Sequence, residues 1–101
     1  LERGEDVAYA ACGIPYWIAG EVGDIDDLVA HDAAYFRDRR RIDVRLDAEA
    51  RAVDPEARTV TLADGEVLSY GALVLATGAR ALRPGVPGVD LPGVLTVRDL
   101  A

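Results

Sequence analysis

The chain has 101 residues, half of them hydrophobic, and a net charge of −7 at pH 7. This length allows one modest hydrophobic core, and the hydrophobic content excludes a disordered tail. The negative charge argues against nucleic acid or an anionic membrane as partner, and no apolar run approaches the roughly 20 residues that cross a bilayer. A single cysteine excludes an internal disulfide, and because no signal-peptide pattern is present we expect a cytoplasmic protein.

The first residues, Leu1–Arg3, are interpreted as the end of a β-strand. In a dinucleotide-binding fold, an acidic residue at the end of the second strand accepts hydrogen bonds from the adenosine ribose, and Glu2 suits that role. A solvent-exposed glutamate is the alternative. The phosphate-binding Gly-x-Gly-x-x-Gly turn would lie about 20 residues earlier and is not in the sequence. We therefore expect a fold whose first βα unit is missing.

The most informative stretch is 8–20, which contains the single cysteine followed by Gly13, Ile14 and Pro15. Proline fits the opening turn of a helix, so we predict an irregular turn that leads into a short helix, with Cys12 at or just before its first turn. Unpaired backbone N–H groups and the helix dipole favour the thiolate there, the form that attacks disulfides, persulfides and peroxides. The alternative is a small buried hydrophobic residue.

The segment 21–41 is polar. Its acidic part, Glu21–Asp27, is predicted as a loop, and Asp32 is predicted to be the N-cap of a short helix that runs to about Arg40. His31 is interpreted as a surface residue. The basic cluster of the chain comes next and consists of Arg37, Arg39, Arg40 and Arg41. This cluster is either a solvated helix end or a docking site for a phosphorylated substrate such as coenzyme A.

Alternation with a period of two begins at Ile42. Ile42, Val44 and Leu46 alternate with charged residues, which predicts a half-buried strand. Three further segments are separated by Asp-Pro and Asp-Gly turn signals, which predicts a three-stranded antiparallel meander. We expect its strands at Ala50–Val53, Thr59–Leu62 and Glu66–Tyr70.

The apolar run Ala72–Ala76 predicts a strand buried on both faces of a parallel sheet. Thr77 and Gly78 follow at its carboxyl end, where open α/β sheets bind cofactors and glycine permits close backbone approach; an ordinary turn is the alternative. Beyond it, the Pro- and Gly-rich segment Arg83–Gly93 predicts a domain boundary, and Val94–Val97 a short strand.

The residues Cys12-Gly13-Ile14-Pro15-Tyr16, just downstream of Leu1-Glu2-Arg3-Gly4, resemble the flavin-dependent pyridine nucleotide–disulfide oxidoreductases with a single redox cysteine. That family includes coenzyme A-disulfide reductase, NADH oxidase, NADH peroxidase and NADH-dependent persulfide reductase. The resemblance continues through residues 36–44, 59–62, 75–79 and 83–98. It implies an α/β fold, namely an FAD/NAD(P)-binding Rossmann-like domain whose parallel sheet carries the three-stranded antiparallel meander.

The resemblance also implies FAD and NAD(P)H as cofactors, Cys12 as the catalytic thiol and a homodimer. It assigns the following residues to FAD: Glu2, Arg3, Ala50, Thr77 and Gly78. It assigns Arg40 and Ala11 to the substrate. Residues 1–82 would then be a partial FAD-binding domain, and residues 83–101 would lead to an NAD(P)H-binding domain outside this chain. We expect the 101-residue piece alone to be inactive.

This chain departs from the coenzyme A-disulfide reductase pattern at two positions. Ala8 replaces a serine and Ala11 an asparagine, and both polar groups help to hold the thiol substrate in those enzymes. The substrate therefore stays open among a small disulfide, a persulfide, and oxygen or peroxide. Two other hypotheses remain: a ferredoxin-reductase-like flavoprotein with an incidental cysteine, and a non-enzymatic α/β binding module without flavin.

Overall fold

The computed structural model describes residues 1–100, which form two compact units. The first unit contains Leu1–Tyr9 and Val29–Leu75, and the second contains Ala10–Leu28 and the chain from Ala76 onward. Among the described residues, no helix has the length and apolar character needed to cross a membrane. Short helices and antiparallel strands are both present, which agrees with the expected mixed α/β content.

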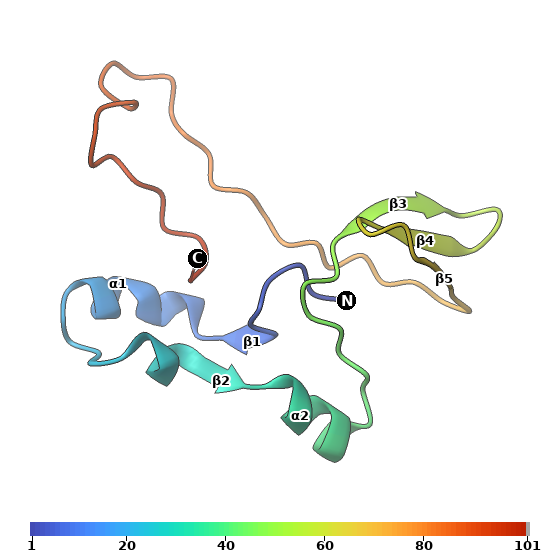
Figure 1. Cartoon of the computed structure of the whole chain (residues 1–101). Coiled ribbons are helices and arrows are strands. Elements are labelled where there is room, and N and C mark those ends of the chain that lie inside the picture. Colours follow the sequence, from blue (N-terminus) through green and yellow to red (C-terminus); the bar gives the residue numbers. More distant parts are fainter. Residues whose placement is uncertain (101) are drawn as a thin grey trace. The chain divides into compact units, whose positions relative to one another are not determined.

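The first unit contains a three-stranded antiparallel sheet in the order β3-β4-β5 (Figure 1). The strands are β3 (Ala50–Asp54), β4 (Thr59–Leu62) and β5 (Val67–Ser69). In the middle strand, Val60 and Leu62 are buried while the threonines beside them are half-buried, which is the alternation expected of a strand with one covered face. The predicted meander is confirmed, with a last strand shorter than expected.

Aspartate side chains hold both turns of the meander. Asp54 Oδ1 accepts hydrogen bonds from two backbone N–H groups of its turn, at 2.9 and 2.8 Å. Asp64 Oδ1 accepts one from the backbone N–H of Glu66 at 2.9 Å, and Gly65 beside it has a φ of +92°. Aspartate and glycine occupy these places because one caps free N–H groups and the other adopts the left-handed region without strain.

A second sheet pairs β1 (Ala8–Tyr9) with β2 (Val29–His31) in antiparallel orientation (Figure 1), and the sequence indicated neither strand. Helix α2 (Ala33–Tyr35) follows and continues as a π-helical turn, η3 (Phe36–Arg40). Asp32 Oδ1 accepts a hydrogen bond from the backbone N–H of Tyr35 at 2.7 Å. The predicted N-cap and the predicted helix end near residue 40 are therefore confirmed.

The strand predicted at Ile42, Val44 and Leu46 is wrong, because no strand is assigned there. Arg41 ends the helical segment in the left-handed conformation, with a φ of +57°. The backbone N–H of Ile42 still donates to the carbonyl oxygen of Phe36 at 3.1 Å, so it belongs to the helix cap and not to a ladder. The alternation of residue types reflects partial burial of Val44 and Leu46 on one side of an irregular segment.

The second unit begins with the 3₁₀ turn η1 (Ala11–Gly13), which leads directly into helix α1 (Ile14–Ile18). Cys12 therefore lies just before the first turn of α1, and Pro15 lies in the opening turn, both as predicted. A further 3₁₀ helix, η2 (Ile25–Leu28), occupies part of the segment that was predicted as a loop.

The buried residues of this unit are Ile14 from α1 and Leu28 from η2, each 4% exposed. Gly13 lets the two elements approach, because a Cβ atom at this position would lie 2.5 Å from Leu28 Cδ2. The backbone N–H of Ala10 also donates to the carbonyl oxygen of Leu28 at 2.7 Å. The turn that carries the cysteine is thus packed against η2.

The strands predicted at Ala72–Ala76 and Val94–Val97 are not assigned in the described structure, so both predictions are wrong for this chain. Val74 and Leu75 are 85% and 71% exposed. A parallel strand needs neighbouring strands to hydrogen-bond it and helices to cover its faces. Within residues 1–100, segment 72–76 makes no backbone–backbone hydrogen bond. The segment is apolar, but no neighbouring strand pairs with it to form a sheet.

Candidate functional site

Cys12 is the candidate reactive group, and its position follows from the backbone of η1. The residue is exposed, which rules out the alternative interpretation as a small buried hydrophobic residue. No side chain caps η1 or α1. The turn is instead closed by the backbone N–H of Gly13, which donates to the carbonyl oxygen of Ala10 at 2.8 Å. The neighbouring Ala11, also exposed, presents only a methyl group.

Glu2 is anchored through both its backbone and its side chain. Its backbone N–H donates to the carbonyl oxygen of Arg45 at 2.8 Å, and its carbonyl oxygen accepts from the N–H of Ala48 at 2.9 Å. Glu2 Oε1 accepts from the backbone N–H of Gly4 at 2.7 Å, which orients the carboxylate and leaves Oε2 for another donor. No strand is assigned to Leu1–Arg3, contrary to the prediction, and Arg3 is exposed.

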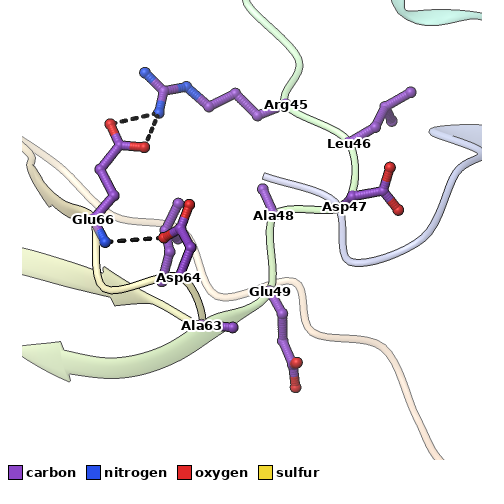
Figure 2. A pocket seen from close by; sticks show the side chains of 9 residues that line it. Arg45, Leu46, Asp47, Ala48, Glu49, Ala63, Asp64 and Glu66 are labelled. Atoms are coloured by element: carbon purple, nitrogen blue, oxygen red, sulfur yellow. Dashed lines mark hydrogen bonds and ion pairs between the residues drawn. The ribbon is translucent and has the colours of Figure 1, made fainter.

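An open cavity of about 450 Å³ lies between the segment that follows Arg45 and the hairpin turn between β4 and β5. Figure 2 shows the guanidinium of Arg45 facing the carboxylate of Glu66, with Nη1 donating to Oε1 at 2.9 Å and to Oε2 at 3.0 Å. The cavity reaches Glu49, the residue before Ala50, which opens β3. Its lining combines the carboxylate side chains of Asp47, Glu49, Asp64 and Glu66 with leucine and alanine side chains, so it offers acceptors to hydroxyl or amino donors beside apolar surface.

The same ion pair accounts for the shifted titration of Arg45. Its hydrogen bond to Glu66 and the negative charge of that carboxylate raise the pKa of Arg45, with smaller contributions from Asp43 and Asp64. Both partners are about half exposed, so the pair mainly orients the segment after Arg45 against the hairpin and adds little stability.

Arg40 belongs to a group of aromatic side chains that the sequence did not indicate, in which His31 and Arg40 are exposed and Tyr35 and Phe36 are half-buried. Its Nη2 donates to Tyr35 Oη at 3.3 Å, and its guanidinium carbon lies 5.8 Å from the centroid of that ring. His31 stacks on the same ring, with centroids 3.7 Å apart and planes at 6°, and Phe36 meets both edge-on. His31 ends β2 and Tyr35 ends α2, so the stacking depends on the connection at Asp32 and no local pattern in the sequence indicates it.

Thr77, Gly78 and Ala79 lie in an irregular segment, in which the glycine has left-handed geometry with a φ of +69°. Arg98 contacts this segment: its Nε donates to the carbonyl oxygen of Ala79 at 2.8 Å. A Cβ atom on Gly78 would lie 2.9 Å from Arg98 Nη2. The sequence indicated the glycine but not the arginine, which lies 19 residues beyond Ala79.

The predicted site residues divide between the two units. The first unit contains Glu2, Arg3, Arg40 and Ala50, and it links Glu2 by hydrogen bonds to the segment that leads into β3. The second unit contains Ala11, Cys12, Thr77 and Gly78. Among the described residues, no group of three or more histidine, cysteine, aspartate or glutamate side chains is arranged to hold a metal ion.

Comparison with known proteins gives matches that cover between 69% and the whole of this chain. A family model described as pyridine nucleotide-disulphide oxidoreductase matches residues 1–101. The NADH oxidase of Methanocaldococcus jannaschii is 32% identical over 104 residues, covering 99% of this chain and 23% of the relative. The ferredoxin–NAD(+) reductase component of the biphenyl dioxygenase system of Paraburkholderia xenovorans is 40% identical over 70 residues, covering 69% of this chain and 17% of the relative.

Among solved structures, an NAD-dependent persulfide reductase from A. fulgidus is similar with a TM-score of 0.86 and 35% sequence identity. The match covers 98% of this chain and 19% of that protein. The chain thus spans less than a quarter of the length of the proteins it matches.

Proposed function

Because the chain belongs to the pyridine nucleotide-disulphide oxidoreductase family, we propose that it forms part of an FAD-dependent NAD(P)H oxidoreductase that acts through Cys12. The observation that carries the proposal is an exposed cysteine in a 3₁₀ turn directly ahead of a helix, packed against η2 through Gly13. In this proposal residues 1–82 belong to the FAD-binding domain, and residues 83–101 lead toward an NAD(P)H-binding domain.

The residues present are suited to FAD, a cofactor of this family together with NAD(P)H. Glu2 has one carboxylate oxygen held by the N–H of Gly4, so the other is oriented to accept from a ribose hydroxyl. The cavity ahead of Ala50 offers apolar side chains and carboxylate acceptors to the adenosine half. Gly78, with no side chain and a left-handed φ, permits a ligand to approach its backbone on the side away from Arg98. When bound, FAD would supply two electrons from NAD(P)H to a sulfur.

Cys12 provides the nucleophile in this mechanism. Its thiolate attacks the inner sulfur of a persulfide R–S–SH, so that a Cys12–S–S–R bond forms, the S–S bond of the substrate breaks and HS⁻ leaves. Two electrons and one proton then return the Cys12 thiolate and release R–SH. The overall balance is R–SSH + NAD(P)H + H⁺ giving R–SH + H₂S + NAD(P)⁺. A symmetrical disulfide reacts by the same two bond exchanges, while a peroxide would convert Cys12 to a sulfenic acid.

A persulfide is the substrate we propose to test before the others. Ala11 is exposed beside Cys12 and offers no hydrogen-bonding group to orient a bulky disulfide. Ala8 lies in β1, paired with His31, and likewise presents only a methyl group. The similarity to a persulfide reductase supports the same substrate class. Arg40, exposed near Tyr35, is proposed to contact the phosphates of a coenzyme A-linked substrate.

The test compares the wild-type gene product with Cys12→Ser in NADH- and NADPH-dependent reduction of a small persulfide. We expect bound FAD in both proteins, and loss of at least about 10²-fold in kcat for the variant, because a hydroxyl cannot replace the thiolate. Ala19→Ser, at the exposed end of α1, is the matched control and should retain activity. A protein that takes up no FAD would refute the proposal and favour a binding module.

A second candidate is a ferredoxin-reductase-like electron carrier, favoured by the 40% identity to the dioxygenase reductase component. In such a protein Cys12 is incidental. Cys12→Ser would then keep FAD and keep full NAD(P)H-dependent reduction of a ferredoxin or an artificial one-electron acceptor. The same variant therefore separates the two functions.

A further inference from the structure

Gly78 and Arg98 are in direct contact although 20 positions separate them in the sequence. The Nε of Arg98 donates to the carbonyl oxygen of Ala79 at 2.8 Å, the residue directly after the glycine. The Nη2 of Arg98 lies 2.9 Å from where a Cβ atom of residue 78 would stand. A side chain at position 78 would therefore displace the guanidinium of Arg98 from its present position.

The backbone favours glycine at position 78, because its φ of +69° strains other residues. A Cβ atom there would also displace the guanidinium of Arg98, which lies at the end of a flexible side chain and can shift at small cost. Segment 72–76, which leads into segment 77–79, makes no backbone–backbone hydrogen bond within residues 1–100. The contact with Arg98 is thus a link between segment 77–79 and a distant segment of the same unit.

We propose that Arg98 is a positioning residue for cofactor binding, because it fixes the backbone of the irregular segment 77–79 in the conformation that binds the cofactor. This inference rests on the proposed function, in which Thr77 and Gly78 contact FAD. Arg98 acts through this segment: its Nε donates to the carbonyl oxygen of Ala79, and its Nη2 lies where a side chain of residue 78 would begin. A segment fixed before the ligand arrives loses less conformational entropy on binding.

The chain contains a matched control for this role in Arg83. Arg83 Nη2 donates to the carbonyl oxygen of Val94 at 2.8 Å, and its Nη1 lies 3.4 Å from Asp90 Oδ1. Arg83 thus has the same residue type, lies in the same unit and makes the same kind of bond from guanidinium to backbone. It contacts the connection around 90–94 and makes no described hydrogen bond to segment 77–79.

The experiment measures the dissociation constant of FAD by flavin fluorescence in the full gene product, with the visible flavin spectrum as the second readout. We expect Arg98→Ala to weaken FAD binding about tenfold and to shift the spectrum, and Arg83→Ala to change binding by less than about threefold. Arg98→Lys should recover part of the loss, since an ammonium can donate to Ala79 but has no counterpart of the Nη2 beside Gly78. Thermal unfolding of the apo-proteins establishes that all variants fold.

A double-mutant cycle with Gly78→Ala tests the contact itself. If a Cβ atom displaces the guanidinium, Gly78→Ala should weaken FAD binding by a smaller factor in the Arg98→Ala background than in the wild type. Equal losses for Arg98→Ala and Arg83→Ala, unchanged FAD affinity in Arg98→Ala, or a strictly additive cycle would each overturn the positioning role. In these cases a flavin-containing wild type leaves the proposed function intact. A wild type that takes up no FAD overturns both.

Discussion

Substituting Gly13 by alanine tests how the cysteine-bearing turn is held in place. The added Cβ atom would stand 2.5 Å from Leu28 Cδ2, about 1 Å inside ordinary carbon–carbon contact. Leu28 is 4% exposed and packs in the same unit as Ile14, so its methyl group has little room to retreat. The backbone of Leu28 is held by the hydrogen bond from the Ala10 N–H to the Leu28 carbonyl oxygen, at 2.7 Å. The collision must therefore be relieved by a shift of the Leu28 side chain.

The expected size of the effect follows from the chemistry of overpacking. Forcing one extra methyl group into a packed site typically costs about 1–3 kcal/mol, and Gly13→Ala should fall in that range. Gly23→Ala is the matched control, since no atom lies within 4 Å of its added Cβ and its φ is not positive. That control should be neutral or stabilising by up to about 1 kcal/mol, because alanine restricts the unfolded chain.

The assay is thermal and urea unfolding of the full gene product, with the rate at which Cys12 reacts with a thiol reagent as a local readout. Leu28→Ala alone should cost about 2–5 kcal/mol, and the double variant with Gly13→Ala should cost less than the sum, because the collision is gone. If Gly13→Ala proves as harmless as Gly23→Ala, or if the two losses simply add, the packing argument fails.

Two further predictions concern single side chains. Glu66→Gln should lower the thermal midpoint slightly at about 0.05 M salt and not at about 1 M, because its bond to Arg45 is exposed and screened. Because the pKa of Arg45 is raised in the folded protein, the stabilisation from this pair is fully present at any pH below the ordinary pKa of arginine, and it is lost only as the pH rises through the raised pKa. The ionisation of Arg45 therefore adds no pH dependence near neutrality. A difference in thermal midpoint that changes between mildly acidic and mildly basic buffers would contradict this. Asp32→Ala should cost about 1 kcal/mol by urea unfolding, because the N–H of Tyr35 loses its acceptor, whereas Asp38→Ala, in an exposed ion pair, should cost less than about 0.5 kcal/mol. Equal losses would refute the capping role.

Local chemistry in the sequence was sufficient for the meander, the N-cap and the cysteine turn. The Asp-Gly signal and the aspartate at position 54 act within a few residues, so their outcome does not depend on the rest of the fold. The same holds for Pro15, which marks the first turn of α1. These features could be predicted because the atoms that decide them are close in the chain.

The predictions from the sequence failed where the local structure depends on residues that are distant in the chain. Val74 and Leu75 have the apolar character of a buried strand, but a ladder depends on neighbours that residues 1–100 do not provide. Ile42 begins an alternating pattern, yet its N–H group donates to the carbonyl oxygen of Phe36 at the end of the helical segment and not to a neighbouring strand. At the candidate site, Cys12 and Gly78 could be identified from local motifs, while Arg98 could not, because nothing in its own neighbourhood indicates a contact with residue 78.

The meander pairs residues that are near neighbours along the chain, with Asp54 opposite Thr59 across the first turn and Thr61 opposite Val67 across the second. Closing such short loops costs little entropy, and structures dominated by nearby pairings form fastest. During translation, residues 50–69 would therefore organise soon after they leave the ribosome, before Ala79 meets Arg98. The hairpins would serve as the folding nucleus on which the slower, more distant pairings of the protein are built.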